Sequence, residues 1–261
     1  NSAFCEYVGL GPGQLPSIRP SHEVIGVVTE AAALETGIAA GTPVVTGTGD
    51  IAAELVSAGL GRGGEALLAC GSTFCVIRPV DDYLPSRPIG LAAGLLDIRH
   101  MMVGGSTSGG NTRDWAIGLF SGDITSEAMA GETLDAEAAR IRPGSDGLVF
   151  LPYLRGERAP VRDPGARGVL FGLTDAHTRA HVYRGMLEGV GYAVRDIIEA
   201  MEQLSGSSIG RVAAVGGGAS TAWVQIISDI IGLPMTRLTG SSAARGAAIL
   251  AAVGAGVADP R

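Results

Sequence analysis

Clustered glycines separate the apolar segments of this chain. The 261 residues include 41 glycines, and glycine-rich groups stand at positions 47–49, 104–105, 109–110 and 216–218. Glycine adopts positive φ without strain and lets backbone amides approach a ligand closely. Where such groups join a strand to a helix, they are typical of anion and nucleotide sites. The pattern predicts an α/β protein whose turns can bind an anion or a nucleotide.

The apolar runs between these turns predict how strands and helices alternate. The longest helix is predicted at 178–204, because Val182, Met186 and Val190 belong to a series of apolar residues spaced by three and four. The runs 66–70 and 74–80 predict a hairpin around the turn 71–73. Further strands are predicted at 43–46 and 148–151, both buried, and at 212–215 and 235–238, and further helices at 50–60, 111–119, 125–140, 222–231 and 243–253. The strand–helix–strand–helix ending implies a sheet covered by helices.

Charge and composition indicate which kinds of molecule the protein can bind and where it can act. The net charge of −7 and the lack of a Lys/Arg run argue against nucleic acid, so a small molecule is the expected partner. No apolar run reaches the roughly 18 residues of a membrane span. Cys5, Cys70 and Cys75 have neither metal-ligand spacing nor the pattern of a disulfide scaffold, so no metal site is predicted and a reducing cytoplasm is expected. The chain opens at Asn1 without a methionine, and we expect it to be a fragment.

Asp50 follows Gly47-Thr48-Gly49 at the predicted start of a helix. An aspartate in that position is most often an N-cap, which accepts backbone N–H bonds. It can also be a general base, because a carboxylate at the carboxyl edge of a strand faces the cleft and can accept the proton of an attacking hydroxyl. The two roles are compatible.

Other motifs each allow a plain and a functional interpretation. The run 216–220, Gly-Gly-Gly-Ala-Ser, is either a tight turn or a surface that leaves room for adenosine. The turn 71–73, Gly-Ser-Thr, is by pattern a hairpin turn, although its hydroxyls and amides could also bind phosphate. The loop 155–158, Arg-Gly-Glu-Arg, is predicted to be solvated and internally paired rather than a phosphate clamp. His177 and His181 are predicted to be structural or exposed rather than metal ligands.

Two further runs, together with the order of the motifs above, resemble a known protein family. The runs 168–173 (Gly-Val-Leu-Phe-Gly-Leu) and 181–188 (His-Val-Tyr-Arg-Gly-Met-Leu-Glu) match a known signature, except that Gly185 stands where alanine or serine is preferred. The remaining motifs, in chain order, are 47–50, 71–73, Gly110 with Trp115, 151–153, 156–160, 216–219 and 246–248. Together they resemble the FGGY family of carbohydrate kinases, over essentially the whole chain.

The resemblance implies an actin-like, ribonuclease-H-like ATPase fold of two lobes, with the active site between them, and a kinase that uses ATP and Mg²⁺. In such kinases the aspartate at the position of Asp50 is the base toward the sugar hydroxyl and therefore also contacts the substrate. The implied nucleotide positions are Gly71, Ser72 and Thr73 near the phosphates, Gly110, and Gly217, Gly218 and Ala219 against the adenosine. This sequence departs from the family in having Gly-Ser-Thr for Gly-Thr-Ser at 71–73 and Ser241 or Ser242 where many members carry glutamate. The family's Asp-Gly-Thr hairpin, which helps to hold Mg²⁺ and phosphate, has no counterpart in the sequence.

The resulting prediction is ATP-dependent phosphorylation of a hydroxyl of a small sugar, ketose or polyol, with a xylulose-type pentulose favoured. Residues 1–64 are assigned to the end of the N-terminal, sugar-binding lobe and residues 65–261 to the C-terminal, nucleotide-binding lobe. This chain alone is expected to be inactive, and the resemblance also implies a homodimer. The alternatives are an actin-like ATPase, which would turn over ATP without sugar, and a non-catalytic module that binds sugar or nucleotide.

Overall fold

A computed structural model describes residues 2–61, 64–122 and 126–259. The chain forms two compact units, which are described separately. The smaller unit comprises Asn1–Thr48 and Leu250–Arg261, and the larger unit comprises Gly49–Ile249. In the part of the chain that the structure describes, no helix is long and apolar enough to cross a membrane.

The smaller unit contains a two-stranded antiparallel sheet. α1 (Ser2–Tyr7) and the 3-10 turn η1 (Pro12–Gln14) precede β1 (Val24–Val27), α2 (Glu30–Thr36) and β2 (Pro43–Val45). The strand predicted at 43–46 is present, but the prediction that it is buried is wrong, since Val44 is 40% exposed. A short apolar run favours a strand, whereas burial depends on a covering layer that the run itself does not specify.

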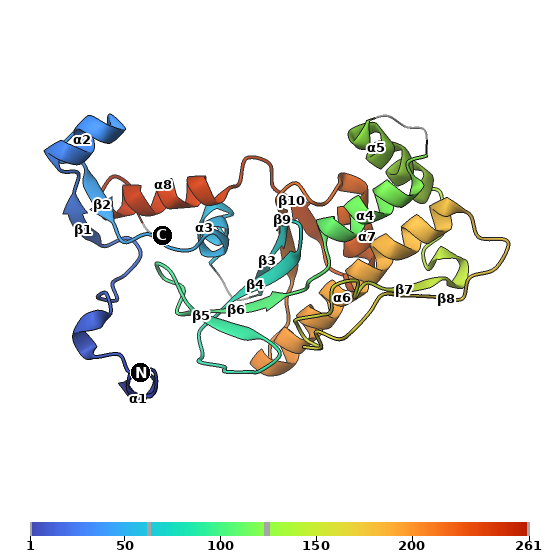
Figure 1. Ribbon diagram of the computed structural model, residues 1–261, viewed down its shortest axis with the longest axis horizontal. Coiled ribbons are helices and arrows are strands. Elements are labelled where there is room, and N and C mark those ends of the chain that lie inside the picture. The colour runs from blue at the N-terminus through green and yellow to red at the C-terminus, as the bar shows by residue number, and fades with distance from the viewer. Residues whose placement is uncertain (1, 62–63, 123–125, 260–261) are drawn as a thin grey trace. The chain divides into compact units, whose positions relative to one another are not determined.

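The larger unit is built on a six-stranded mixed sheet of order β10-β9-β3-β4-β6-β5 (Figure 1). β10, β9 and β3 run parallel, and β4, β6 and β5 add antiparallel pairs. The predicted hairpin is confirmed, with Ala69 opposite Cys75. The strands are β3 (Glu65–Cys70), β4 (Phe74–Val80), β5 (Gly90–Ala93), β6 (His100–Gly105), β9 (Arg211–Val215) and β10 (Met235–Arg237).

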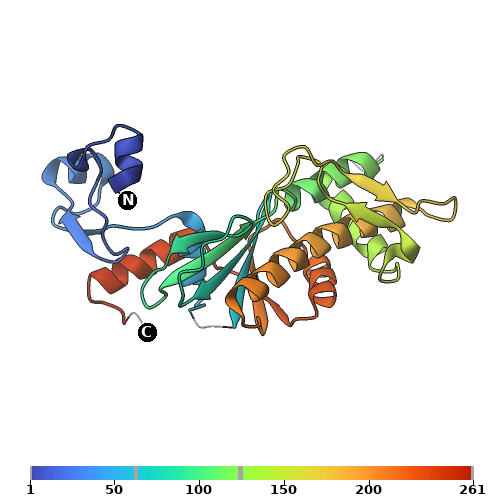
Figure 2. The same ribbon diagram turned by 90° about the horizontal axis from the view of Figure 1, so that it is seen from below.

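Helices cover both faces of this sheet (Figures 1 and 2). α4 (Gly110–Phe120), α5 (Glu127–Ala138), α6 (Arg179–Ser205) and α7 (Thr221–Ile231) contribute to the core on one face, and α3 (Asp50–Ser57) contributes to the core on the other. Successive strand residues alternate between the two cores: Leu68 faces the α6 side and Leu67 the α3 side, and both are fully buried. The predicted α/β class is therefore confirmed. The last helix is α8 (Ala243–Gly254).

The long helix and the short strand beside it show what apolar patterns do and do not predict. α6 confirms the helix predicted at 178–204, and Gly206 ends it in the left-handed conformation. Its neighbour is a hairpin of β7 (Val149–Leu151) and β8 (Val169–Phe171), preceded by the 3-10 turn η2 (Ser145–Gly147). The predicted burial of 148–151 is wrong for Val149 and Leu151, which are 44% and 42% exposed, because alternate residues of a strand face opposite sides. The helix predicted from residue 125 is α5, and residue 125 lies outside the described residues.

Candidate functional site

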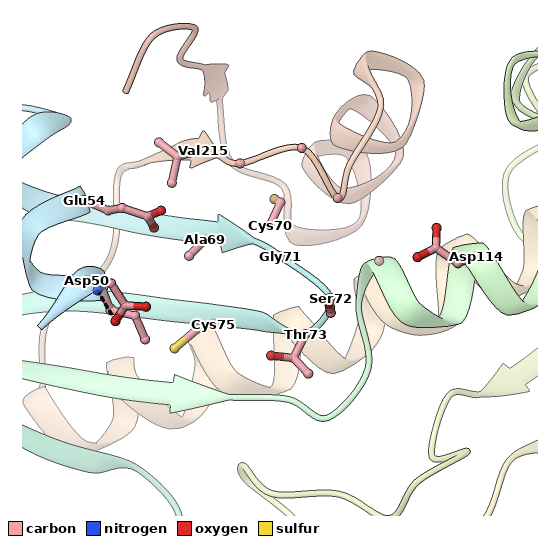
Figure 3. A pocket seen from close by; sticks show the side chains of 15 residues that line it. Asp50, Glu54, Ala69, Cys70, Gly71, Ser72, Thr73, Cys75, Asp114 and Val215 are labelled. Atoms are coloured by element: carbon pink, nitrogen blue, oxygen red, sulfur yellow. Dashed lines mark hydrogen bonds between the residues drawn. The ribbon is translucent and has the colours of Figure 1, made fainter. Parts of the chain in front are cut away.

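A pocket of about 580 Å³ lies in the larger unit, where β3 and β9 end (Figure 3). It is lined by the first turns of α3, the ends of these strands, the turn 71–73, the start of α4 and the turn 216–218. The carboxyl ends of parallel strands are where α/β proteins bind ligands, because loops and helix starts meet there.

Most of the residues that the sequence predicts for a site meet in this pocket. Its lining includes Asp50, Gly71, Ser72, Thr73, Gly110, Gly217 and Gly218. Ala219 is the exception: it does not line the pocket, and its side chain is 2% exposed within the core on the α6 side.

Asp50 is the first residue of α3, and Gly49 is the N-cap. The N-cap interpretation of Asp50 is therefore off by one position, because the extended backbone of Gly49 (φ −69°, ψ 158°) already occupies that place. The Asp50 carboxylate accepts the backbone N–H of Ile51 at 2.8 Å and is otherwise open to the pocket. A negative charge in the first turn of a helix is favoured by the helix dipole.

The glycine turns are joined to one another by backbone hydrogen bonds. The amides of Gly110 and Gly218 donate to the carbonyl oxygens of Gly71 and Cys70 at 3.1 and 2.8 Å. The Asn111 amide donates to the Ser72 oxygen at 2.9 Å. These amides are thus used to assemble the turns, whereas Ser72, Thr73 and the open side of Gly217 line the pocket.

The glycines of these turns differ in how much space a side chain would have. A Cβ on Gly218 would lie 2.4 Å from the Gly71 carbonyl oxygen, and one on Gly110 would lie 2.7 Å from the same atom. A Cβ on Gly217 would meet no atom within 4 Å. Gly218 and Gly110 are therefore required by close backbone packing, whereas Gly217 leaves open space in the pocket.

Two carboxylates that the sequence analysis missed also line the pocket, Glu54 and Asp114. Each stands four residues after a predicted site residue on a helix, Glu54 after Asp50 and Asp114 after Gly110, and that spacing could have pointed to them. Burial, and then the charge of Asp50, raise the pKa of Glu54. The lining contains no cationic side chain, and the described ranges hold no group of three His, Cys, Asp or Glu residues placed to bind a metal by themselves.

Cys70 and Cys75 lie at the same pocket on opposite faces of the hairpin. Both thiols are free. Burial raises the pKa of Cys70 to about 12 and that of Cys75 to about 11. Both residues are therefore protonated thiols at neutral pH, without nucleophilic character.

The arginine-rich loop differs from its prediction at Glu157. Arg155 and Arg158 are exposed, as expected of a solvated loop, but the Glu157 side chain is only 4% exposed and accepts hydrogen bonds from a distant segment. Sequence reasoning failed here because these donors are supplied by residues about fifty positions earlier. No residue of the loop lines the 580 Å³ pocket, so the loop is not placed as a phosphate clamp.

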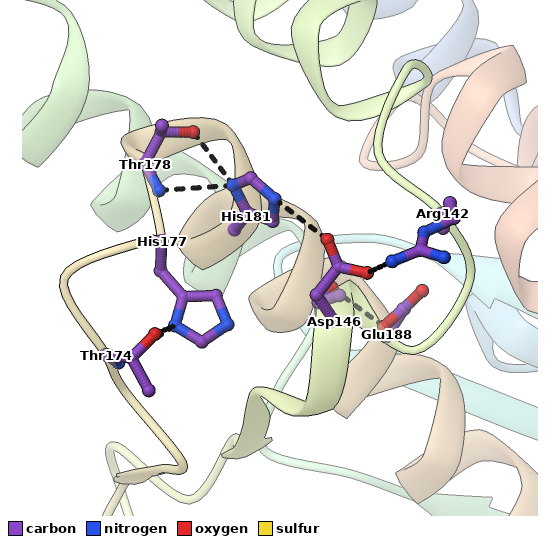
Figure 4. A network of polar contacts seen from close by, with 8 residues as sticks. Arg142, Asp146, Thr174, His177, Thr178, His181 and Glu188 are labelled. Atoms are coloured by element: carbon purple, nitrogen blue, oxygen red, sulfur yellow. Dashed lines mark hydrogen bonds and ion pairs between the residues drawn. The ribbon is translucent and has the colours of Figure 1, made fainter.

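His177 and His181 have structural roles, as predicted (Figure 4). The Nδ1 atom of His181 accepts the Thr178 backbone N–H at 3.1 Å, which completes a capping box at the start of α6. Its Nε2 atom therefore carries the hydrogen and faces Asp146 at 3.3 Å. Asp146 in turn pairs with Arg142 at 2.6 Å, so the histidine links the helix start to the loop before β7.

Known proteins resemble the chain over most of its length. The FGGY family of carbohydrate kinases, C-terminal domain, matches residues 67–255, and the N-terminal domain of the same family matches residues 1–57. A xylulose kinase of Bacillus subtilis is 30% identical over 97% of this chain and 50% of its own length, and a gluconokinase of that species is 32% identical over 85% and 45%.

Solved structures agree with the sequence comparisons. A xylulose kinase from Rhodospirillum rubrum has a TM-score of 0.89 and 31% identity, covering 98% of this chain and 51% of that protein. A gluconate kinase from Lactobacillus acidophilus has a TM-score of 0.88 and 25% identity, covering 100% and 53%. The chain thus spans about half the length of the relatives it matches. It belongs to the FGGY family of carbohydrate kinases, as the order of its motifs predicts.

Proposed function

We propose that the whole protein transfers a phosphoryl group from ATP to a hydroxyl of a small sugar or sugar acid, with a xylulose-type pentulose favoured. The observation that carries the proposal is the pocket in which the open carboxylate of Asp50 meets the turn 71–73 and Gly217. Relatives named as xylulose kinases and gluconokinases support the choice of substrates.

Asp50 is the proposed general base. As the sugar oxygen attacks the terminal phosphorus of ATP, the hydroxyl proton passes to the Asp50 carboxylate and ADP leaves. Little covalent chemistry is then asked of the protein, and the rest of its contribution is positioning and neutralisation of charge. Asp50 is suited to the task because its one hydrogen bond to the Ile51 amide leaves lone pairs free toward the pocket.

The pocket fits ATP and Mg²⁺ by the chemistry of its donors. Ser72 and Thr73 offer hydroxyl donors to phosphate oxygens, and the open side of Gly217 admits a flat group such as adenosine. Mg²⁺ is usually held by one or two carboxylates together with substrate phosphates, and Glu54 or Asp114 would supply such a hard oxygen ligand. When bound, Mg²⁺ supplies the positive charge that the lining lacks.

The remaining assignments are proposals of the same kind. The division into lobes near residue 64 is supported by the two family matches, which end at 57 and begin at 67, and Gly63 at this boundary lies outside the described residues. The cytoplasm is proposed as the site of action, in keeping with three free cysteines. The homodimer stays a prediction of the family resemblance.

The test is Asp50→Asn in the whole protein, assayed as ADP release with xylulose and with gluconate. The amide keeps the acceptor for Ile51 N–H but cannot take the hydroxyl proton, so kcat is expected to fall by about 10²–10⁴ while ATP affinity stays within a few fold. The matched control is Glu30→Gln, which neutralises the first residue of α2 and does not line the pocket. An Asp50→Asn enzyme with near-parental turnover would rule out this base, and parental ADP release that ignores sugar would favour an ATPase.

A further inference from the structure

A buried carboxylate outside the pocket binds the loop that leads into helix α4, whose first residue, Gly110, lines the pocket. Glu157 is 4% exposed and accepts hydrogen bonds from Ser106 Oγ at 2.7 Å, from the Thr107 amide at 2.7 Å and from the Arg158 amide at 2.7 Å. Ser106 and Thr107 belong to the loop 106–109, which joins β6 to α4. A buried carboxylate with several N–H and O–H donors makes strong, charge-assisted hydrogen bonds, so this loop is held firmly.

The other side of the same loop is bonded to the pocket. The Ser106 amide donates to the Phe74 oxygen at 2.9 Å, and the Phe74 amide donates to the Ser108 oxygen at 3.1 Å. Phe74 is the first residue of β4, directly after the turn 71–73. At the far end of the loop, the Gly110 and Asn111 amides donate to the Gly71 and Ser72 oxygens at 3.1 and 2.9 Å. The loop is therefore hydrogen-bonded to Glu157 on one side and to Phe74 on the other, and the start of α4 that follows it is bonded to the turn 71–73.

Glu157 is bonded to uncharged donors from two loops. Its hydrogen bonds come from two backbone amides and two hydroxyls, and within the described residues it forms no ion pair with an arginine. The guanidinium of Arg158 instead donates to the Ser106 carbonyl oxygen at 2.9 Å, which fixes the loop from a second atom. The Ala159 amide donates to the Gly105 oxygen at 3.1 Å, which fixes the end of β6.

We propose that Glu157 is a positioning residue of the nucleotide pocket, which sets the place of the turn 71–73 through the loop 106–109 without contacting the ligand. The inference rests on the proposed function for the identity of the ligand, but the tether itself is independent of it. Loss of the carboxylate frees three donors on the loop, from Ser106 and Thr107, and the loop and turn then move relative to the rest of the pocket.

Glu188 is a matched control in the same unit. It is 3% exposed and accepts hydrogen bonds from the Gly144 amide at 3.0 Å, from Ser145 Oγ at 2.9 Å and from Arg184 Nε at 2.7 Å. Neither Glu188 nor its donors line the pocket. The two carboxylates have similar burial and each accepts a backbone amide and a serine hydroxyl, but Glu188 also pairs with Arg184, and only Glu157 is bonded to the loop 106–109.

The experiment compares Gln and Ala at both positions in the whole protein. Glu157→Ala is expected to raise KM for ATP about tenfold with kcat changed less than about threefold, and Glu157→Gln to raise it less, because the amide oxygen still accepts the two backbone N–H bonds. The Glu188 variants are expected to lose at least as much thermal stability, because they also leave the buried Arg184 unpaired, and to keep the parental KM. Equal changes of KM at the two positions would overturn the proposal, and the Gln pair decides if the Ala variants do not fold.

A second readout needs no nucleotide. Hydrogen exchange is measured at the amides of Phe74, Ser106, Gly110 and Asn111, with the buried amides of α6 as the measure of global unfolding. Faster exchange at these four in Glu157→Gln, and not in Glu188→Gln, supports the tether, whereas unchanged exchange overturns it. Failure of the parent protein to bind ATP would contradict the proposed function and leave this exchange result standing on its own.

Discussion

Gly217 and Gly218 are adjacent, but they are glycine for different physical reasons. Both are predicted from sequence to lie against adenosine, since neither carries a side chain. Both line the pocket, but a side chain on Gly217 would meet open space, whereas Gly218 is packed closely against the backbone of Gly71. Neither has a positive φ, so a side chain at either position is decided by space and not by backbone strain.

We therefore expect Gly217→Val to fold and Gly218→Val to be destabilised. A side chain on Gly217 occupies ligand space, so KM for ATP should rise about tenfold, as the loss of one close contact costs about 1–3 kcal/mol. A side chain on Gly218 must displace the Gly71 carbonyl, at a cost of about 2–4 kcal/mol of unfolding free energy. Urea unfolding and steady-state kinetics measure the two effects. A well-folded Gly217→Val enzyme with unchanged KM would contradict the adenosine assignment.

Single residues could be predicted from sequence where a local pattern surrounds them. Asp50 was found because a glycine turn precedes it and a helix follows, a context contained within a few positions. Glu157 was not found, because its burial depends on Ser106 and Thr107, which no local pattern connects to it. Glu54 was missed for a related reason: a glutamate on a helix is usually a solvated residue, and only the fold turns this one toward the pocket.

Strand β4 is fastened to the end of helix α6 by one buried cation. Arg78 is 1% exposed, and its Nη1 and Nη2 atoms donate to Ser205 Oγ at 2.7 Å and Ser207 Oγ at 2.8 Å. The Ser208 carbonyl oxygen accepts a third bond at 3.3 Å. A cation at a helix C-terminus is favoured by the dipole of the helix, and here it also satisfies groups that leave the helix.

Arg78→Met is expected to lower the free energy of unfolding by about 2–4 kcal/mol, because buried acceptors lose their donor at the helix end. Arg195→Met is the control, since that arginine lies on the surface of α6 in an i,i+4 pair with Glu199 and should cost less than about 1 kcal/mol. Chemical denaturation of the two variants gives both values. Equal losses would show that the Arg78 network adds nothing beyond a surface ion pair.

Elements were predicted well where periodicity is long and less well where only their surroundings decide burial. The 27 residues of α6 give many turns of a consistent apolar stripe, which fixes its type and its ends within about a residue. β7 and β2 have three residues each, and a three-residue apolar run looks the same whether or not another layer packs on the sheet. Burial of these strands is therefore a property of the tertiary structure that a three-residue pattern does not contain.

For the whole molecule, the chain spans about half the length of its relatives, and its pocket presents three carboxylates without a cationic side chain. We expect this chain alone to bind Mg·ATP weakly and to release no sugar-dependent ADP. Calorimetric titration and a coupled ADP assay measure both properties, with the whole protein as the positive control. Robust sugar-dependent turnover by residues 1–261 alone would contradict the expected need for a second lobe.

The packing of Gly71, Gly110 and Gly218 against one another has a consequence for biosynthesis. These glycines leave the ribosome at very different times, and the pocket needs all of them. During translation the hairpin of β3 and β4 can form early, but the part of the pocket lined by the turn 216–218 is absent until residue 218 has emerged. Nucleotide bound in this pocket therefore cannot assist the folding of the nascent chain before that point. A truncated chain that ends before residue 218 lacks this pocket.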